Sequence, residues 1–416
     1  MSNQPQNSQA FMDLEDRFGA HNYHPLPVVL ARGEGVRVWD VEGKEYLDCL
    51  SAYSAVNQGH CHPRIVGALT EQAQKLTLTS RAFFTDRLGR AERKVCELFG
   101  FEKALFMNSG AEGVETAIKL ARRWGYVKKG IPENEAKVVV CSENFHGRTI
   151  TVISFSTDPE SRGGFGPYTP GFVTVPYDDA DALKAAVQDP HVCAFLVEPI
   201  QGEAGVVVPS DGYLAACRAA CSEANVLFIA DEIQTGLGRT GDLLAVQHEG
   251  VQPDMLILGK ALSGGSYPVS CVMANDEVML TIRPGEHGST YGGNPMACAV
   301  TEAALDVLVD EGLTARAKQA GERFRAGLRA FESPIVSLVR GRGLLNAMVI
   351  PPFEQDGQRR TAWDFCVRLA ENGVLAKPTH DDIVRFAPPL VISDEEVDQL
   401  LATIGKTLEE FAGVGV

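Results

Sequence analysis

Short apolar runs alternate with amphipathic segments between about Lys103 and Val272, and this pattern constrains the fold more than any other feature of the sequence. The runs are KALFM, KVVVC, GFVTV, CAFLV, VLFIA and MLILG, and two of the segments between them, AEGVETAIKLARRWGY and YLAACRAACSEAN, have helical spacing. Strands that are apolar along their whole length are buried on both faces. The pattern therefore predicts an α/β domain with a mainly parallel sheet flanked by helices.

A second, smaller α/β domain is predicted after the large one. The C-terminal part, residues 306–416, contains a helical pattern over about 313–328, two strand-like halves around a GRG turn, and the helical segment TAWDFCVRLAENG. The N-terminal segment, residues 1–60, includes VRVWDVEGKEYLDC and is expected to join the small domain and contribute to the active site. Residues 61–305 would then form the large domain.

The composition limits the kinds of ligand and partner that we expect the protein to bind. The formal net charge of -16 repels phosphate backbones and anionic lipid surfaces, and no apolar stretch approaches the roughly 20 residues that span a bilayer. The ten cysteines lack the paired short spacings of zinc sites, and the start MSNQPQNSQ has no basic region followed by an apolar run. We expect a cytoplasmic protein with small-molecule ligands, no nucleic-acid or membrane partner and no metal, even at the crowded GHCHP segment.

Polar residues follow several of the apolar runs, where a parallel sheet places its ligands. Among these residues, Asp231 and Lys260 are the pair that most clearly indicates a catalytic site. A lysine at a buried strand end is unfavourable unless it is neutralised, and an imine with an aldehyde cofactor would neutralise it. A carboxylate one strand away suits a protonated ring nitrogen. The alternative is an ordinary buried salt bridge between the two residues, or a lysine that reaches solvent.

Two small-residue turns precede helices and could bind anions. NSGAEG places Ser109, Gly110 and Ala111 where free backbone amides and the helix dipole favour a phosphate group, although the same turn is also an ordinary N-cap. The turn HGSTYGGNP, around Thr290, has the same character, and its alternative is a simple loop-to-helix junction.

The segment SENFHGRT supplies an aromatic and a cationic candidate. Phe145 has a flat face that could stack on a cofactor ring, and Arg148 has a guanidinium fork suited to a carboxylate. Without context, a phenylalanine of this kind is more often part of the core and an arginine more often part of a surface ion pair.

Taken together in order, the motifs NSGAEGVETA, NFHGRT, VEPIQGEAG, DEIQTGLGRTG, LGKALSGG and STYGGNP resemble those of the fold-type I, class-III aminotransferases that act on ω-amino groups. The resemblance spans nearly the whole chain. It implies a pyridoxal-phosphate enzyme that works as a homodimer, with each active site at the subunit interface.

The resemblance also implies roles for individual residues. Lys260 would bind the cofactor as a Schiff base and carry a proton between two of its carbons, and Asp231 would bind the pyridine nitrogen. Gln234 would contact the phenolic oxygen, and Phe145 and Ile233 would enclose the ring. Ser109, Gly110 and Ala111 would hold the phosphate, together with Thr290 of the neighbouring subunit.

A narrower resemblance, carried by SAYSAVNQGHCHP and AKPTHDDIVRFAPPL, is to the ornithine aminotransferases of this family. It implies that ornithine and 2-oxoglutarate are handled by Tyr23, Tyr53, Arg148, Glu203 and Arg385. Glu203 would pair with Arg385 while ornithine is bound and release it for 2-oxoglutarate, although a fixed ion pair is equally consistent with the residues alone.

Two other functions stay open at this point. One is another ω-aminotransferase, acting on acetylornithine, 4-aminobutyrate or lysine, against which the Tyr23 hydroxyl is the discriminating feature. The other is a non-catalytic regulator that binds pyridoxal phosphate. No basic helical segment of the kind that binds DNA accompanies the motifs.

Overall fold

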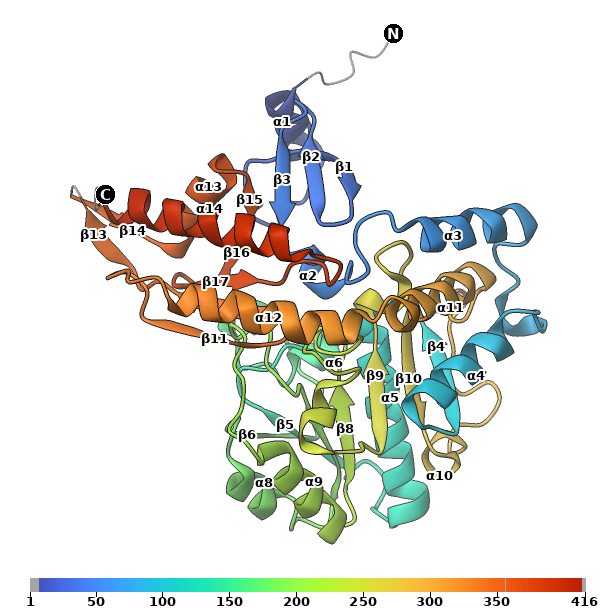
Figure 1. The fold of residues 1–416 in the computed structure, drawn as a ribbon. Coiled ribbons are helices and arrows are strands. Elements are labelled where there is room, and N and C mark those ends of the chain that lie inside the picture. The colour runs from blue at the N-terminus through green and yellow to red at the C-terminus, as the bar shows by residue number, and fades with distance from the viewer. Residues whose placement is uncertain (1–6, 356, 414–416) are drawn as a thin grey trace.

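The computed structural model describes residues 7–355 and 357–413, and its large domain is built around a seven-stranded sheet in the order β4-β10-β9-β8-β7-β5-β6 (Figure 1). The strands are β4 Lys103–Met107, β5 Lys137–Cys141, β6 Phe172–Val175, β7 Val192–Val197, β8 Leu227–Asp231, β9 Met255–Leu258 and β10 Ser270–Ala274. Strands β6, β5, β7, β8 and β9 pair in parallel, whereas β10 is antiparallel to both β4 and β9. The predicted α/β class with a mainly parallel sheet is confirmed.

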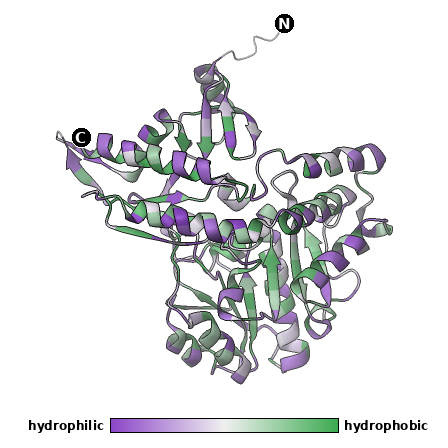
Figure 2. Cartoon of the chain, in the orientation of Figure 1, coloured by the Kyte–Doolittle hydropathy of each residue, from purple (hydrophilic) through white to green (hydrophobic). Residues whose placement is uncertain are grey.

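The continuous apolar runs arise because each central strand contributes to two cores. In β5, Val138 and Val140 belong to the cluster that includes α5 (Gly110–Trp124), and Val139 and Cys141 belong to the cluster that includes α9 (Tyr213–Glu223). Figure 2 shows hydrophobic residues concentrated on the strands and hydrophilic residues on the outer helices. Burial of alternate residues on opposite faces fixes the sheet between its helical layers.

The other helical segments of the large domain connect these strands. They are α3 Pro63–Lys75, η1 Ser80–Ala82, α4 Leu88–Phe99, η2 Gly125–Lys129, α6 Ile150–Ile153, α7 Pro159–Arg162, α8 Ala180–Ala186, η3 Ala245–Glu249, η4 Lys260–Ser263, α10 Asp276–Met279 and α11 Pro295–Asp310. None of the helices within the described residues combines the length and apolar character needed to cross a membrane.

The C-terminal part packs its own sheet, in the order β11-β12-β17-β16, against α12. Its elements are α12 Leu313–Arg329, β11 Leu338–Arg342, β12 Leu345–Val349, β13 Phe353–Gln355, β14 Gln358–Arg360, α13 Ala362–Glu371, β15 Val374–Leu375, β16 Lys377–Thr379, β17 Ile383–Phe386 and α14 Asp394–Ala412. The GRG turn connects two antiparallel strands, as its sequence predicted.

The N-terminal segment is joined to this C-terminal part by backbone pairing. It comprises α1 Ser8–Phe18, β1 Leu30–Glu34, β2 Arg37–Asp40, β3 Glu45–Asp48 and the short α2 Ser51–Ser54. Strand β3 pairs in parallel with β15, so that the first and last quarters of the chain share one sheet.

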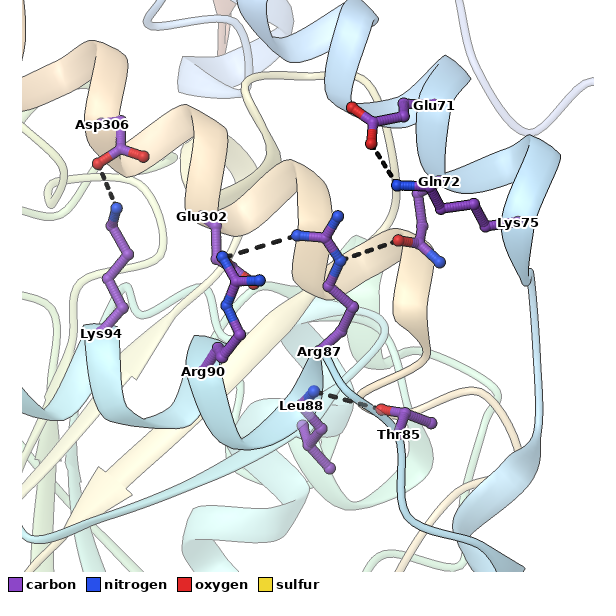
Figure 3. Close-up of polar contacts among 10 residues, drawn as sticks. All are labelled: Glu71, Gln72, Lys75, Thr85, Arg87, Leu88, Arg90, Lys94, Glu302 and Asp306. Atoms are coloured by element: carbon purple, nitrogen blue, oxygen red, sulfur yellow. Dashed lines mark hydrogen bonds and ion pairs between the residues drawn. The ribbon is translucent and has the colours of Figure 1, made fainter.

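Ion pairs and a hydrogen bond join α4 to α11 and α3 (Figure 3). On α4, Arg90 binds Glu302 of α11 at 2.9 Å, and Lys94 forms an ion pair with Asp306 of the same helix. Arg87, just before α4, donates to Gln72 of α3 at 2.9 Å. The three helices are therefore held together next to the loop that precedes α11.

A buried arginine links three distant segments. Arg239, which follows β8, is fully buried and donates to the carbonyls of Leu344 (2.9 Å) and Pro388 (2.6 Å) and to Asn57 Oδ1 (2.6 Å). Burial lowers the pKa of its guanidinium to about 9. These bonds fix the N-terminal segment and the C-terminal sheet against the large domain.

Candidate active site

The carboxyl ends of β8 and β9 bring the two predicted chemical residues to one cavity. Asp231 is the last residue of β8, and Lys260 lies two residues beyond the end of β9. The cavity has a volume of about 200 Å³. It is lined by Gly110, Ala111, Phe145, His146, Gly147, Glu198, Ile200, Asp231, Ile233, Gln234, Thr235 and Lys260.

The Asp231 carboxylate is held from two sides and is only 4% exposed. Its Oδ1 accepts a hydrogen bond from the backbone N–H of Ile233 at 3.1 Å, and its Oδ2 lies 2.6 Å from Nδ1 of the buried His146. Burial by itself would lower the pKa of His146, but the hydrogen bond and charge of Asp231 outweigh it and raise that pKa above its usual value. The Asp231 side chain therefore has a fixed orientation, with the buried His146 imidazole bonded to one of its oxygens.

Lys260 presents a free amine to the same cavity. It has neither a hydrogen-bond nor an ion-pair partner within residues 7–355 and 357–413, so the salt bridge with Asp231 that the sequence left open is not formed. Burial lowers the pKa of the amine, although the carboxylates of Glu203 and Asp231 act in the opposite direction. A lysine with a lowered pKa is suited to act as a nucleophile and a base.

The turn before α5 leaves backbone amides available to a ligand, whereas the side chain of Ser109 is already hydrogen-bonded within the helix. Ser109 is the N-cap of α5, and its side chain and backbone N–H are both bonded to Glu112 in a capping box. Gly110 and Ala111 line the cavity, and their first-turn N–H groups have no intrahelical acceptor. A Cβ on Gly110 would lie 3.0 Å from Ile233 Cδ1, so the close approach of these residues favours glycine.

The predicted ring-binding residues Phe145 and Ile233 form part of the cavity wall. The backbone N–H of Phe145 is fixed by Glu198 at 2.9 Å. Gln234 donates from Nε2 to Glu203 at 3.1 Å, and its buried Oε1 has no partner among the described residues. A Cβ at residue 202 would lie 1.5 Å from this oxygen, so Gly202 is required for the position of the amide.

Glu203 and Arg385 form an ion pair beside the cavity. Arg385 Nη1 donates to Glu203 Oε1 at 2.7 Å, and its side chain is buried. Burial raises the pKa of Glu203, but the charge and hydrogen bond of Arg385 outweigh it and hold that pKa below its usual range. The Arg385 guanidinium also lies 4.9 Å from the centre of the Tyr53 ring. The structure therefore brings three of the five predicted substrate residues together.

The other predicted residues lie outside the cavity lining. Arg148 donates to Ser161 at 2.6 Å and lies 5.4 Å from the Phe145 ring, next to the cavity wall. Tyr23 is 76% exposed. Thr290 is exposed on the loop before α11 and is not among the residues that line the cavity.

Two buried residues of the site were not assigned roles from the sequence. His146 stands directly after Phe145 in a segment that had been singled out, yet its contact with Asp231 joins residues 85 positions apart. Glu198 lies one residue beyond the end of β7. Burial raises its pKa to about 7, with His146 acting to lower it and Asp231 to raise it.

The arrangement fits a flat aromatic aldehyde that carries a phosphate. Asp231 is placed for a protonated ring nitrogen, the amides of Gly110 and Ala111 for an anion, and the amide of Gln234 for a ring substituent. Phe145 and Ile233 supply apolar walls, and Lys260 a free amine. No group of three or more histidine, cysteine or acidic side chains that could hold a metal occurs in the described part of the chain.

Comparison with known proteins agrees with this chemistry. Residues 18–408 match the family described as aminotransferase class-III. The mitochondrial ornithine aminotransferase of Drosophila ananassae is 61% identical over 96% of this chain and 91% of its own length. A crystal structure of the ornithine aminotransferase from Toxoplasma gondii ME49 superposes with a TM-score of 0.95 at 48% identity, covering 99% of this chain and 97% of that one. A structure of an acetylornithine aminotransferase from Elizabethkingia anophelis has a TM-score of 0.89 and 54% identity, with coverages of 98% and 100%.

Proposed function

The chain belongs to the class-III aminotransferases, which are pyridoxal-phosphate enzymes, and on that premise we propose that it is an ornithine δ-aminotransferase. The reaction transfers the δ-amino group of L-ornithine to 2-oxoglutarate and yields L-glutamate 5-semialdehyde and L-glutamate in two half-reactions. The observation that carries the substrate assignment is the Glu203–Arg385 ion pair, with the Tyr53 ring 4.9 Å from the guanidinium and the Glu203 charge acting on the Lys260 amine. Full-length similarity to ornithine aminotransferases supports it.

The cofactor residues each have a defined task. Bound pyridoxal phosphate supplies an electrophilic carbonyl and a ring that accepts an electron pair. Asp231, oriented by His146, would hold the ring nitrogen in its protonated form. Lys260 would hold the cofactor through its amine and, as a free amine, would move the proton at the reacting carbon of the substrate. Its lowered pKa favours the neutral amine that this step requires.

The substrate residues determine which amine reacts. In this proposal Tyr23 and Arg148 bind the α-amino and α-carboxylate groups of ornithine, so that the δ-amine is directed to Lys260. Glu203 neutralises Arg385 during this half-reaction, because a free guanidinium beside the reacting carbon would favour a substrate with a carboxylate there. In the other half-reaction Arg385 is released and binds the α-carboxylate of 2-oxoglutarate, and Arg148 binds the distal one.

Acetylornithine is the second candidate donor, because the Elizabethkingia anophelis protein is as similar to this chain as several ornithine aminotransferases are. An acetyl group would crowd the Tyr23 hydroxyl, which suits a free α-amino group. The test is a donor panel of ornithine, acetylornithine, 4-aminobutyrate and lysine with 2-oxoglutarate. We expect ornithine to have the highest kcat/KM, and a preference for acetylornithine would overturn the substrate assignment.

We also propose a homodimer in a reducing compartment such as the cytoplasm. Exposed aromatic side chains at Phe83 (71%) and Phe84 (98%) offer apolar surface to a second copy, and Thr290, which would contribute to the partner's site, is exposed. All ten cysteines are free thiols. Sedimentation equilibrium tests the assembly, and a Lys260→Ala plus Thr290→Ala mixing experiment tests sharing: hybrids should differ in activity from the average of the two parents.

A further inference from the structure

The segment that carries Tyr53 has a backbone conformation that only glycine adopts without strain. Four consecutive residues of α2, none of them glycine, have positive φ: Ser51 (50°), Ala52 (46°), Tyr53 (60°) and Ser54 (73°). At Ala52 and Tyr53 the ψ values of 47° and 43° complete one turn of left-handed helix. Each such residue is unfavourable because its Cβ approaches the following carbonyl oxygen, so the turn persists only where its surroundings hold it.

Asp48 holds the start of this turn. Its Oδ1 accepts the backbone N–H groups of Leu50 at 2.8 Å and Ser51 at 3.0 Å, and its Oδ2 lies 2.7 Å from Nε2 of His60. The Asp48 residue is only 7% exposed. The buried Asp48 carboxylate therefore accepts both backbone N–H groups at the start of the turn. His60, which follows the turn in the chain, orients this carboxylate.

The same turn is attached to the strand that carries Arg385. The Ser51 hydroxyl donates to the carbonyl of Ala387 at 2.6 Å, and the Ala387 N–H donates to the carbonyl of Cys49 at 2.7 Å. Ala387 follows Arg385 by two residues. The left-handed turn thus fixes the Tyr53 ring relative to the guanidinium that it faces.

We infer that Asp48 is a positioning residue for the substrate pocket: by holding the left-handed turn, with His60 orienting it, Asp48 keeps Tyr53 against Arg385. The inference rests on the proposed function only in that Tyr53 and Arg385 handle substrate. Asp48 touches neither of them and lines no part of the cofactor cavity. Without its carboxylate, two backbone donors lose their acceptor and the strained turn relaxes, which removes the aromatic face from the guanidinium.

The first experiment compares Asp48→Ala with a matched control. Asp40 accepts the backbone N–H groups of Glu42 (3.0 Å) and Lys44 (2.8 Å) in a similar turn outside the site. Asp48→Ala should lower kcat/KM for both ornithine and 2-oxoglutarate by about tenfold, with the cofactor absorbance unchanged, whereas Asp40→Ala should stay within about twofold of wild type. Asp48→Asn retains an acceptor and should lose less. An Asp48→Ala enzyme with unchanged kinetics would overturn the inference.

Two combined variants test whether the effect passes through the turn. In a Tyr53→Leu background Asp48→Ala should add less than about twofold, because residues that act as one unit are not additive. Ala52 is exposed, and Ala52→Gly removes a strained Cβ, so adding it to Asp48→Ala should restore most of the lost kcat/KM. Full additivity with Tyr53→Leu, or an absence of rescue, would show that Asp48 acts by another route.

Hydrogen exchange provides a readout that needs no turnover. Amides in residues 49–57 should exchange faster in Asp48→Ala than in Asp40→Ala, and unchanged exchange overturns the inference whatever the kinetics. If wild type fails with ornithine while this exchange difference is observed, the proposed function fails and the inference about the turn stands. Should Asp48→Ala not fold, His60→Ala replaces it, with the same expectations and the same contrary outcomes.

Discussion

The cofactor end and the substrate end of the site are built in different ways. The cofactor end, with Asp231, Lys260 and the Gly110 amide, comes from strand ends along one edge of the central sheet. The substrate end joins Tyr53, from the N-terminal segment, to Glu203 and to Arg385, which are 182 residues apart. One end therefore depends on a single sheet, and the other depends on packing between domains.

We therefore expect the cofactor end to determine the rate of the reaction and the substrate end to determine which substrate is preferred. Changes at the cofactor end should slow the reactions of all substrates together, because every substrate uses the same electron-accepting ring and the same amine. Changes at the substrate end should alter the ratio between substrates.

Replacement of Lys260 by alanine should abolish turnover. The variant loses both the covalent attachment of the cofactor and the base that moves the proton, and we expect kcat to fall by about 10⁴-fold or more. Steady-state assays together with the visible absorption spectrum of the cofactor measure both losses. Lys184→Ala, on the exposed surface of α8, is the control and should leave both unchanged. A coloured, active Lys260→Ala enzyme would refute the assignment.

Asp231→Asn should slow both half-reactions to a similar extent. The amide cannot stabilise a protonated ring nitrogen, and it also loses its charged contact with His146. We expect kcat to fall by about 10²- to 10³-fold for ornithine and for glutamate alike. Single-turnover rates of the two half-reactions provide the measurement, and a loss confined to one substrate would contradict the proposed division.

Glu203→Gln should alter selectivity more than rate. Without its carboxylate partner, Arg385 attracts the α-carboxylate of glutamate throughout the cycle. The ratio of kcat/KM for glutamate to that for ornithine should rise by about tenfold in half-reaction assays. Glu322→Gln, which removes an ion pair with Arg325 outside the site, is the control. An unchanged ratio would mean that the Glu203–Arg385 pair is a fixed structural bridge.

The sequence predicted the sheet well because burial on both faces leaves a readable pattern. Six of the seven strands correspond to continuous apolar runs, and Asp231 and Lys260 were found because each ends such a run. Strand β10, SCVMA, was not among the predicted runs, although it is buried along its whole length like the central strands that were. Patterns within one segment therefore identified the cofactor end.

Contacts between distant segments could not be read in this way. The His146–Asp231 pair and the Arg239 bonds depend on how loops pack after the sheet has formed. The left-handed turn at residues 51–54 contains no glycine, so that the usual signal for positive φ is missing. Ser109 was predicted to belong to a phosphate-binding turn, and the structure shows that its side chain and backbone N–H are both bonded to Glu112 in a capping box.

The smallest predicted effect concerns the stability of the cofactor end itself. Burial raises the pKa of Glu198 to about 7, so the folded state favours the protonated carboxyl and is penalised when that group ionises. Below the ordinary pKa of 4.5 the penalty is absent, and it grows with pH until it is complete above about 7. Glu198→Gln, which can still accept the Phe145 N–H, should therefore be more stable than wild type at pH 8 by about 1–3 kcal/mol and equal to it near pH 4.5.

Urea unfolding of the cofactor-free protein at several pH values measures this difference. A variant that is less stable than wild type at pH 8 would show that the ionised Glu198 is stabilised by His146 more than burial penalises it. A difference that does not depend on pH would mean that the group does not titrate in this range. The expected result would show that a buried charge at the cofactor end lowers folding stability. The cause is that the fold that positions Asp231 and Phe145 also removes Glu198 from water.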